Sequence, residues 1–385
     1  MQAAELKTLT PQPPTYRVEP EYEPVVKDNR PLLKADSLPH SQVQMLTIEE
    51  LDKKYPPFVR CDNYGILGCG KLKFKEKILL GLGLVVLVPI RVVVLVTLLL
   101  VYYVICRICT VAKAPNIEEG EQEDYAHMGG WRRGVIVRTG RFLSRVVLFV
   151  MGFCWIRETR RESYADEQFN REKDQSGGPD RPAAIISNHV SYLDILYHTS
   201  SNFPSFVAKR SVGKLPLVGL ISKCLGCVYV QREAKSSDFK GVSGVVNDRI
   251  REAQQNFDAP NMMLFPEGTT TNGNFLLPFK TGAFLAKAPV LPILLRFPYS
   301  RFSPAWETIS GVRHIVFLLS QFVNYLEVIR LPIYYPTQLE KDDPKLYAYN
   351  VRRCMAHEGS LALSDLGLPE KRVYHAALLD LFLKQ

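Results

Sequence analysis

The chain has 385 residues, 46% of them hydrophobic, and a formal net charge of +9 at pH 7. This composition supports one large domain or two ordinary ones and excludes a wholly disordered protein. The basic excess suits an anionic membrane surface or a phosphate-bearing substrate, whereas nucleic acid is discounted as a partner because no recognisable nucleic-acid-binding motif accompanies the charge.

Residues 1–60 are polar and rich in proline, with few side chains to bury, so we expect them to form a disordered tail. They lack the apolar core of a secretory signal. From residue 78 to residue 105 the chain then becomes almost continuously apolar, which exceeds the roughly 20 residues that a membrane-spanning helix needs.

Two residues complicate this apolar run. Pro89 would kink or divide a helix, and Arg91 must reach the interface or face other protein, since a charge at the bilayer centre costs roughly 2.5 to 3.5 kcal/mol. Two arrangements stay open, a kinked span and two short helices that enter one leaflet. A buried helix of a soluble core is less favoured because the run exceeds an ordinary core helix.

Residues 146–156 form a second apolar stretch, too short to cross a bilayer alone. Arginines precede it, namely Arg132, Arg133, Arg138, Arg141 and Arg145. The stretch fits a helix at an anionic interface and an amphipathic core helix equally well. The sequence thus predicts a membrane-anchoring helical region over 61–156, followed by a charged linker over 157–182.

Short apolar runs then alternate with helix-like stretches, a pattern that predicts an α/β domain over 183–335 with a central β-sheet flanked by helices. The predicted strands are 183–187, 205–208, 227–231, 262–265 and 290–296, and a helix is predicted over 237–255. Residues 315–326 favour a packed or interfacial helix. A C-terminal helical extension over 336–385 follows, in which Asp343 and Pro344 begin the last helix.

The cysteines include two Cys-x-x-Cys pairs, Cys106 with Cys109 and Cys224 with Cys227. Such spacing could indicate zinc or redox chemistry, but both pairs lie in apolar surroundings, so we interpret them as buried small hydrophobic residues and expect no metal site. A reducing, cytosol-facing environment fits best.

A histidine and a carboxylate stand five residues apart where a strand gives way to a helix, at His189 and Asp194. An imidazole held by a carboxylate can act as a general base near neutral pH. A purely structural alternative exists, because Ser191 and Asp194 have the spacing of a capping box and could simply start the helix.

Two further charged residues follow predicted strands. Arg232 follows 227–231 and Glu267 follows 262–265. Since ligands gather beyond the carboxyl ends of parallel strands, we expect a base, a phosphate-binding cation and a carboxylate beside the permissive Gly268 at one edge. Taken singly, Arg232 could be a surface ion-pair residue, and 265–273 a turn rich in loop-forming residues.

The ordered set of these motifs resembles the glycerophospholipid acyltransferases of the lysophosphatidic acid and lysophosphatidylcholine type. The matching blocks are Asn188-His189 through Asp194, Gly226 through Arg232, Phe265-Pro266-Glu267-Gly268-Thr269, and the weaker Val290-Leu291-Pro292-Ile293. The third block continues as Thr270-Thr271-Asn272-Gly273, which is similar to the lysophosphatidylcholine and plant lysophosphatidylethanolamine branch. The length and proline-rich front are similar to the plant form.

The resemblance implies an acyl-CoA-dependent acyltransferase in which His189 takes the proton from the free hydroxyl of a lysophospholipid while Asp194 steadies the imidazole. It implies that Arg232 and Lys209 hold the acceptor's phosphate. Glu267 and Gly268 would shape the acceptor site, and Thr269 would contribute a hydroxyl. Beyond acyl-CoA as co-substrate, no cofactor or metal is implied.

The same resemblance implies a place on the endoplasmic reticulum membrane, since both substrates carry acyl chains that a site at the bilayer surface can take directly. No Asn-x-Ser/Thr glycosylation acceptor occurs, which agrees with a cytosolic active site. The alternatives are a lysophosphatidic acid or glycerol-3-phosphate acyltransferase, an acyl-CoA hydrolase that uses the same base on water, and a catalytically silent membrane scaffold.

Overall fold

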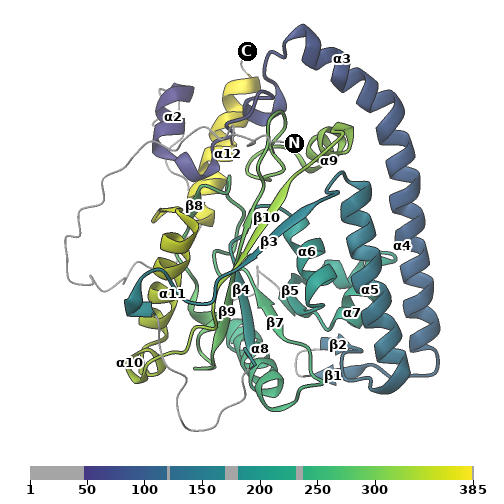
Figure 1. Cartoon of the computed structure of the whole chain (residues 1–385), viewed down its shortest axis with the longest axis vertical. Coiled ribbons are helices and arrows are strands. Elements are labelled where there is room, and N and C mark those ends of the chain that lie inside the picture. Colours follow the sequence, from purple (N-terminus) through teal and green to yellow (C-terminus); the bar gives the residue numbers. More distant parts are fainter. Residues whose placement is uncertain (1–46, 119–121, 170–180, 231–236, 384–385) are drawn as a thin grey trace, which may run out of the picture.

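The computed structural model describes residues 47–118, 122–169, 181–230 and 237–383. Within them, a seven-stranded sheet has the order β3-β10-β9-β4-β7-β5-β6 (Figure 1). Its strands are β3 (Ile156–Arg160), β4 (Ala184–Ser187), β5 (Ser205–Lys209), β6 (Val228–Val230), β7 (Met262–Leu264), β9 (Val290–Arg296) and β10 (Leu326–Arg330). Neighbouring strands from β9 to β6 are parallel, while β10 runs antiparallel to β9 and parallel to β3. The predicted α/β fold, with a central sheet flanked by helices, is confirmed.

The central strand β4 illustrates why these residues form the middle of the sheet. Ala184, Ile185 and Ile186 are fully buried, the continuous apolar run typical of a parallel strand that is covered on both faces. Because side chains alternate along a strand, Ile185 packs into one hydrophobic cluster and its two neighbours into another.

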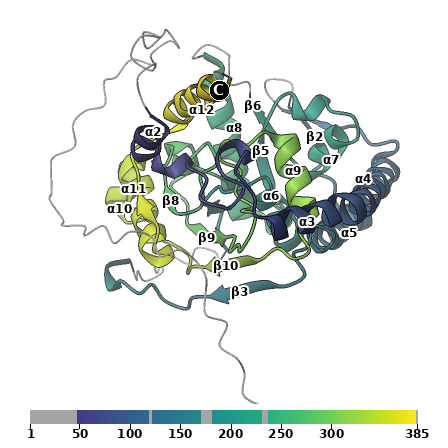
Figure 2. The ribbon, with the colours of Figure 1, turned by 90° about the horizontal axis from the view of Figure 1, so that it is seen from above.

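Helices cover both faces of the sheet (Figures 1 and 2). One face carries α5 (Gly130–Val150), α6 (Leu193–Ser201), α7 (Val218–Leu225) and α9 (Gly311–Ser320), and the other carries α8 (Ser237–Gln255) and α11 (Pro344–Gly359). The helices α10 (Gln338–Asp342) and α12 (Leu368–Leu383) complete the C-terminal region. Two small sheets pair β1 (Asn116–Glu118) with β2 (Gln122–Asp124), and β8 (Phe275–Leu276) with β11 (Ala362–Leu363).

The first apolar run forms one helix, Phe74–Thr110, which is long and apolar enough to cross a membrane. It consists of α3 (Phe74–Leu82), a π-helical turn (Gly83–Leu87) and α4 (Val88–Thr110). Pro89 is the second residue of α4, just after the π-helical turn, and the helix is continuous through it. The helix bends between α3 and α4 (Figure 1), and whether it spans a bilayer or enters one leaflet stays a prediction.

Arg91 faces other parts of the protein, which is one of the two positions expected for a charge within an apolar helix. Its guanidinium donates to backbone carbonyl oxygens that follow and end α9, those of Leu319, Gln321 and Phe322, the first at 2.8 Å. On its other side α4 lies beside α5, and both views show the pair (Figures 1 and 2). The charge that would be costly in lipid therefore holds the long helix to the domain.

Residues 47–60 do not belong to a disordered tail, so that prediction is wrong for this stretch. They form α2 (Ile48–Lys54), which Thr47 caps, and a short 3₁₀ helix (Pro56–Phe58). The buried side chains of Leu51, Tyr55 and Phe58 pack with α12. A polar, proline-rich average composition concealed these few apolar residues; residues 1–46 lie outside the described part of the chain.

Three other expectations need correction. Residues 157–160, expected to open a charged linker, belong to the edge strand β3, whose exposed charged side chains suit a sheet edge. The helix expected over 315–326 ends at Ser320, and β10 begins at Leu326. Asp343 caps α11 as predicted, by accepting from the Lys345 backbone N–H at 2.8 Å, but α12 is a further helix after it.

Candidate active site

The predicted site residues that the structure describes lie at or after the carboxyl ends of parallel strands. This is the condition under which the sequence analysis expected them to meet at one edge of the sheet. His189 follows β4, Glu267 follows β7, which is the neighbour of β4, and Lys209 ends β5, the next strand along. Arg232 lies outside the described residues, so its meeting with His189 stays a prediction. The structure thus brings three of the sequence-predicted positions to one edge of the sheet.

The imidazole of His189 is held by a buried carboxylate. The His189 Nδ1 lies 2.9 Å from Asp194 Oδ2, and the two side chains are 20% and 0% exposed. The same carboxylate oxygen accepts from the backbone N–H groups of Val190 at 2.7 Å and Ser191 at 3.0 Å. An ionised carboxylate accepts the Nδ1 proton, which leaves the Nε2 lone pair of the partly exposed ring available to a substrate.

The capping alternative holds only in part. Asp194 lies in the first turn of α6 and accepts from the Ser191 backbone, but the Ser191 hydroxyl has no hydrogen-bond partner among the described residues. The imidazole is the additional partner of Asp194 that a helix cap does not require. The ring is also stacked on Phe265 of the third sequence block, with centroids 4.1 Å apart and planes at 17°.

The Glu267 carboxyl group is buried and accepts hydrogen bonds from two backbone N–H groups. Its Oε1 accepts from the His189 N–H at 2.8 Å and its Oε2 accepts from the Leu277 N–H at 2.9 Å. Burial raises the pKa of this carboxyl group to about 8, although both N–H groups favour the charged form. The carboxylate therefore fastens the segment after β7 to the segment after β4, and it can shape a ligand site only through the loops it holds.

Gly268 makes the turn that follows Glu267. Its φ is +71°, and a Cβ there would lie 2.6 Å from the Nζ of Lys280, so a larger residue would be strained and crowded. The next residue, Thr269, is partly exposed at the same turn. Lys209 is exposed at the end of β5, two strands away from β4.

Two loop contacts beside His189 were not predicted. The Thr271 N–H donates to the His189 carbonyl at 3.0 Å, and the Trp306 N–H donates to the Val190 carbonyl at 2.9 Å. The first could have been suspected from the continuation of the third sequence block. The second had no signal in the sequence, because residues near 306 carry no motif and lie far along the chain.

His198, four residues after Asp194 on α6, also escaped the sequence analysis. It is fully buried, neither ring nitrogen has a hydrogen-bond partner among the described residues, and burial lowers its pKa to about 3. Its ring packs edge-on against Phe265, with centroids 6.1 Å apart. His198 is therefore a neutral neighbour that supports the ring on which His189 is stacked.

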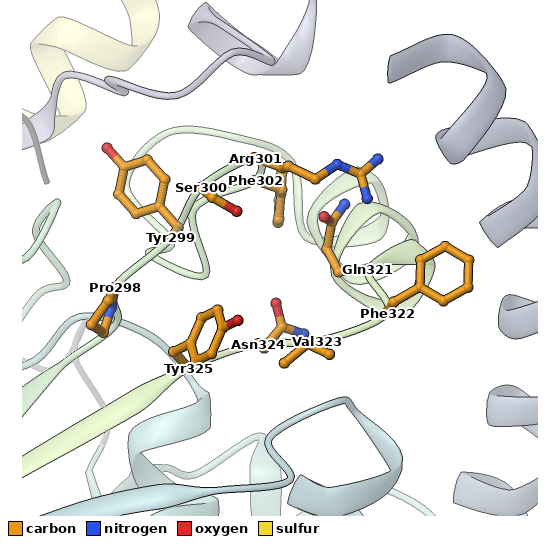
Figure 3. A pocket seen from close by; sticks show the side chains of 10 residues that line it. All are labelled: Pro298, Tyr299, Ser300, Arg301, Phe302, Gln321, Phe322, Val323, Asn324 and Tyr325. Carbon is orange, nitrogen blue, oxygen red and sulfur yellow. The ribbon is translucent and has the colours of Figure 1, made fainter. Parts of the chain in front are cut away.

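A cavity of about 180 Å³ opens beyond the ends of β9 and β10, between residues 298–302 and 321–325 (Figure 3). Arg301 at its rim pairs with Glu76 of α3, with Nε to Oε1 at 2.7 Å. None of the site residues that the structure describes lines this cavity, so it does not locate the reacting groups.

The interpretation of the two cysteine pairs as buried residues is confirmed. All four thiols, those of Cys106, Cys109, Cys224 and Cys227, are buried. Burial also raises the pKa of Cys227 to about 12, which disfavours the thiolate that a metal would need. Among the described residues, no group of three His, Cys, Asp or Glu side chains could hold a metal ion.

Comparison with known proteins places this geometry in context. The Acyltransferase family model matches residues 160–296. The chain is 62% identical over 374 residues to Lysophospholipid acyltransferase LPEAT1 of Arabidopsis thaliana, which covers 92% of this chain and 93% of that protein. It is 37% identical over 186 residues to Lysophosphatidylcholine acyltransferase of Drosophila melanogaster, which covers 48% of this chain and 34% of that protein.

Among solved structures, the 1-acyl-sn-glycerophosphate (LPA) acyltransferase PlsC from Thermotoga maritima is similar with a TM-score of 0.43 and 13% sequence identity, over 74% of this chain and 98% of that one. The chain thus spans nearly the whole of the Arabidopsis relative but only about a third of the Drosophila relative.

Proposed function

The chain belongs to the lysophospholipid acyltransferase family, and from this premise we propose that it transfers the acyl group of acyl-CoA to the free hydroxyl of a lysophospholipid, with His189 as general base. The observation that carries the assignment of the base is the 2.9 Å contact between His189 Nδ1 and Asp194 Oδ2. It fixes one ring nitrogen as a donor and leaves the other as an acceptor at a partly exposed position.

The proposed reaction is a single displacement. His189 Nε2 takes the hydroxyl proton as the lysophospholipid oxygen attacks the thioester carbonyl carbon of acyl-CoA. The carbon–sulfur bond then breaks, and the departing thiolate takes the proton back from the imidazolium as free CoA forms. Because a thioester is already activated, the chain needs only to align two amphiphiles and remove one proton, and no metal or other cofactor is required.

For the acceptor we propose lysophosphatidylethanolamine, with lysophosphatidylcholine as the second choice. The Thr270-Thr271-Asn272-Gly273 continuation of the third block supports this branch over the lysophosphatidic acid enzymes. Arg232 and Lys209 are proposed to bind the acceptor's phosphate, because a guanidinium and an ammonium beyond parallel strand ends suit that group. Glu267, Gly268 and Thr269 would shape the acceptor site.

The proposed location is the endoplasmic reticulum membrane with the active site on the cytosolic face. The helix Phe74–Thr110 supports membrane attachment by its length and apolar composition. Exposed aromatic side chains of α5 and the residues after it, those of Phe142, Phe149 and Trp155, suit the same interface. A bilayer-bound site could take both substrates without extracting their acyl chains into water.

The function is tested by assaying membranes that contain the full chain with radiolabelled acyl-CoA and a panel of acceptors. We expect labelled diacyl phospholipid from lysophosphatidylethanolamine and, at a lower rate, from lysophosphatidylcholine. Lysophosphatidic acid and glycerol-3-phosphate serve as comparison acceptors, and their preference would move the assignment to the alternative branch. Label appearing only as free fatty acid would instead identify a hydrolase, and no turnover with any acceptor would favour the scaffold.

Replacing Asp194 by asparagine should separate the charge of this residue from its geometry. The asparagine oxygen can take the position of Oδ2 and keep its three donors, while the amide nitrogen takes the position of Oδ1, which has no partner among the described residues. We expect a lower melting temperature, because the amide nitrogen is a buried donor with no acceptor near the Oδ1 position in the described part of the chain, and a kcat about 10²-fold lower, because the imidazolium loses its counter-charge. Asp194→Ala should also lose stability, and equal kcat values for Asp194→Asn and wild type would refute the role of the charge.

A further inference from the structure

The loop that follows Glu267 is hydrogen-bonded to a segment from the N-terminal part of the chain. The Asn272 backbone N–H donates to the Pro57 carbonyl at 2.9 Å, and its side-chain Nδ2 donates to the carbonyls of Pro56 at 2.9 Å and Val59 at 3.0 Å. Three hydrogen bonds from one residue fix the middle of the loop to a segment more than 200 positions earlier.

Helix α12, near the C-terminus, is hydrogen-bonded to the same loop. Lys371 Nζ donates to both the carbonyl oxygen and the hydroxyl oxygen of Thr270 at 2.7 Å, and it lies 3.5 Å from the Trp306 carbonyl. An ammonium has three donors, and these three oxygens surround it. Thr270 is itself buried and its hydroxyl donates to the Trp306 carbonyl, so the ammonium joins two loops at one point.

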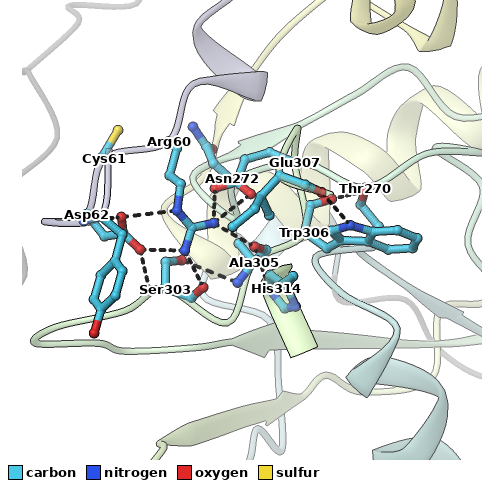
Figure 4. A network of polar contacts seen from close by, with 12 residues as sticks. Arg60, Cys61, Asp62, Thr270, Asn272, Ser303, Ala305, Trp306, Glu307 and His314 are labelled. Atoms are coloured by element: carbon cyan, nitrogen blue, oxygen red, sulfur yellow. Dashed lines mark hydrogen bonds and ion pairs between the residues drawn. The ribbon is translucent and has the colours of Figure 1, made fainter. Parts of the chain in front are cut away.

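The loop that contains Trp306 contacts Val190, the residue next to the proposed base His189. Arg60 Nη1 donates to the Glu307 carboxylate at 3.0 Å, and Arg60 Nη2 donates to the Ser303 carbonyl at 2.9 Å (Figure 4). Trp306, between them in the chain, donates its backbone N–H to Val190, the residue after His189. Both Arg60 and Glu307 are buried, so this network is part of the interior.

The contacts converge on the reacting groups. One residue after Thr270, the Thr271 N–H holds the His189 carbonyl, and at the far end of the loop the Leu277 N–H holds Glu267. Leu277 is buried among apolar side chains of α2 and α12. The loop is therefore fixed at its start by Lys371, in its middle by the N-terminal segment and at its end by the apolar cluster. Residues 56–62, Trp306 and Lys371 all lie outside the span 160–296 that the family model matches.

We propose that Lys371 is a positioning residue for acyl transfer, which acts by holding the Thr270 loop and Trp306 in register with His189. This inference rests on the proposed function, because it concerns the same site. It assigns α12 and residues 56–62 to the active site as its support, although they contact neither reacting group. The Lys371 ammonium supplies three hydrogen-bond donors. In the variant Lys371→Met, a side chain of similar length would supply none.

A role in stability alone is the competing explanation, and Tyr374 offers a matched control. It stands one turn further along α12, and its hydroxyl donates to Asp52 of α2 at 2.7 Å, away from the Thr270 loop. Lys371→Met and Tyr374→Phe each remove polar contacts between α12 and the rest of the chain. Only the first releases the loop beside His189.

The experiment measures kcat and both KM values of the full-length enzyme in membranes, with lysophosphatidylethanolamine and acyl-CoA, well below the temperature at which the variants inactivate. We expect Lys371→Met to lower kcat roughly tenfold with little change in KM for acyl-CoA, since misplacing reacting groups slows the chemical step. Lys371→Arg should recover part of the rate, and Tyr374→Phe should keep the wild-type kcat while it inactivates at a lower temperature.

A Lys371→Met enzyme with the kcat of Tyr374→Phe would overturn the inference. If Lys371→Met does not accumulate, Thr270→Val replaces it, because that variant loses the hydroxyl contact but keeps the carbonyl contact to Lys371. We expect a kcat about threefold lower for it, and an unchanged value would also overturn the inference. A wild-type enzyme without acyl transfer would refute the proposed function, which is a separate outcome.

Discussion

Replacing His189 by alanine is expected to lower the rate of acyl transfer by about 10²- to 10⁴-fold, the range that general acid–base catalysis contributes. The chain should stay folded, because Asp194 keeps two backbone N–H donors and the His189 backbone N–H still reaches Glu267. The measurement is the initial rate of labelled phospholipid formation at equal amounts of enzyme.

The matched control for this variant is His357→Ala. His357 lies on α11 with its side chain 55% exposed, and its ion-pair partner Glu358 is not one of the predicted site residues. We expect wild-type activity from it. If His189→Ala retained more than about a tenth of the wild-type rate, the base would have to be another group.

Replacing Glu267 by glutamine should be severe, although the two side chains have nearly the same shape. Above pH 8, where the Glu267 carboxyl group is ionised, both of its oxygens accept from backbone N–H groups, so the amide nitrogen of glutamine must face either His189 N–H or Leu277 N–H. A buried donor left unpaired costs about 1–3 kcal/mol. We expect the free energy of unfolding to fall by that amount and activity to fall by about 10²-fold, because the His189 backbone loses its anchor.

The control is Glu252→Gln on α8, whose side chain is 49% exposed, and its stability should stay within about 0.5 kcal/mol of wild type. Wild-type stability and activity in Glu267→Gln would show that the carboxylate holds neither loop.

The raised pKa of Glu267 gives this variant a pH signature. An acid whose pKa rises from 4.5 to about 8 on folding contributes stability that is fully present below 4.5 and is lost as pH rises through 8. Glutamine does not titrate, so the difference in melting temperature between wild type and Glu267→Gln should narrow from pH 5 to pH 8.5. A difference that widens over this range would contradict the assigned direction of the shift.

The strands from β9 to β6 could be predicted from the sequence because buried parallel strands leave a strong signal, whereas β3 and β10 were not predicted. Residues 184–186 and 290–296 are nearly uninterrupted apolar runs, and polar motif residues directly follow the strands β4 and β7. The dyad of His189 and Asp194 was found for the same reason, since both partners lie within one strand-to-helix junction.

The parts that escaped prediction depend on distant contacts. Lys371 and Thr270 are 101 positions apart, and no local sequence pattern around a lysine on a helix indicates its partner. The role of Glu267 was open for a related reason: the motif predicts a carboxylate at this turn but not that both of its oxygens accept from backbone. Residues 47–60 were misjudged because composition averages over the few apolar residues that pack.

The most direct test of the proposed reaction is the release of free CoA thiol by wild-type membranes with and without lysophosphatidylethanolamine. A base that activates the acceptor hydroxyl predicts CoA release that requires the acceptor and equals the phospholipid formed, mole for mole. CoA release at the same rate without acceptor, accompanied by free fatty acid, would contradict the account and assign the base to water.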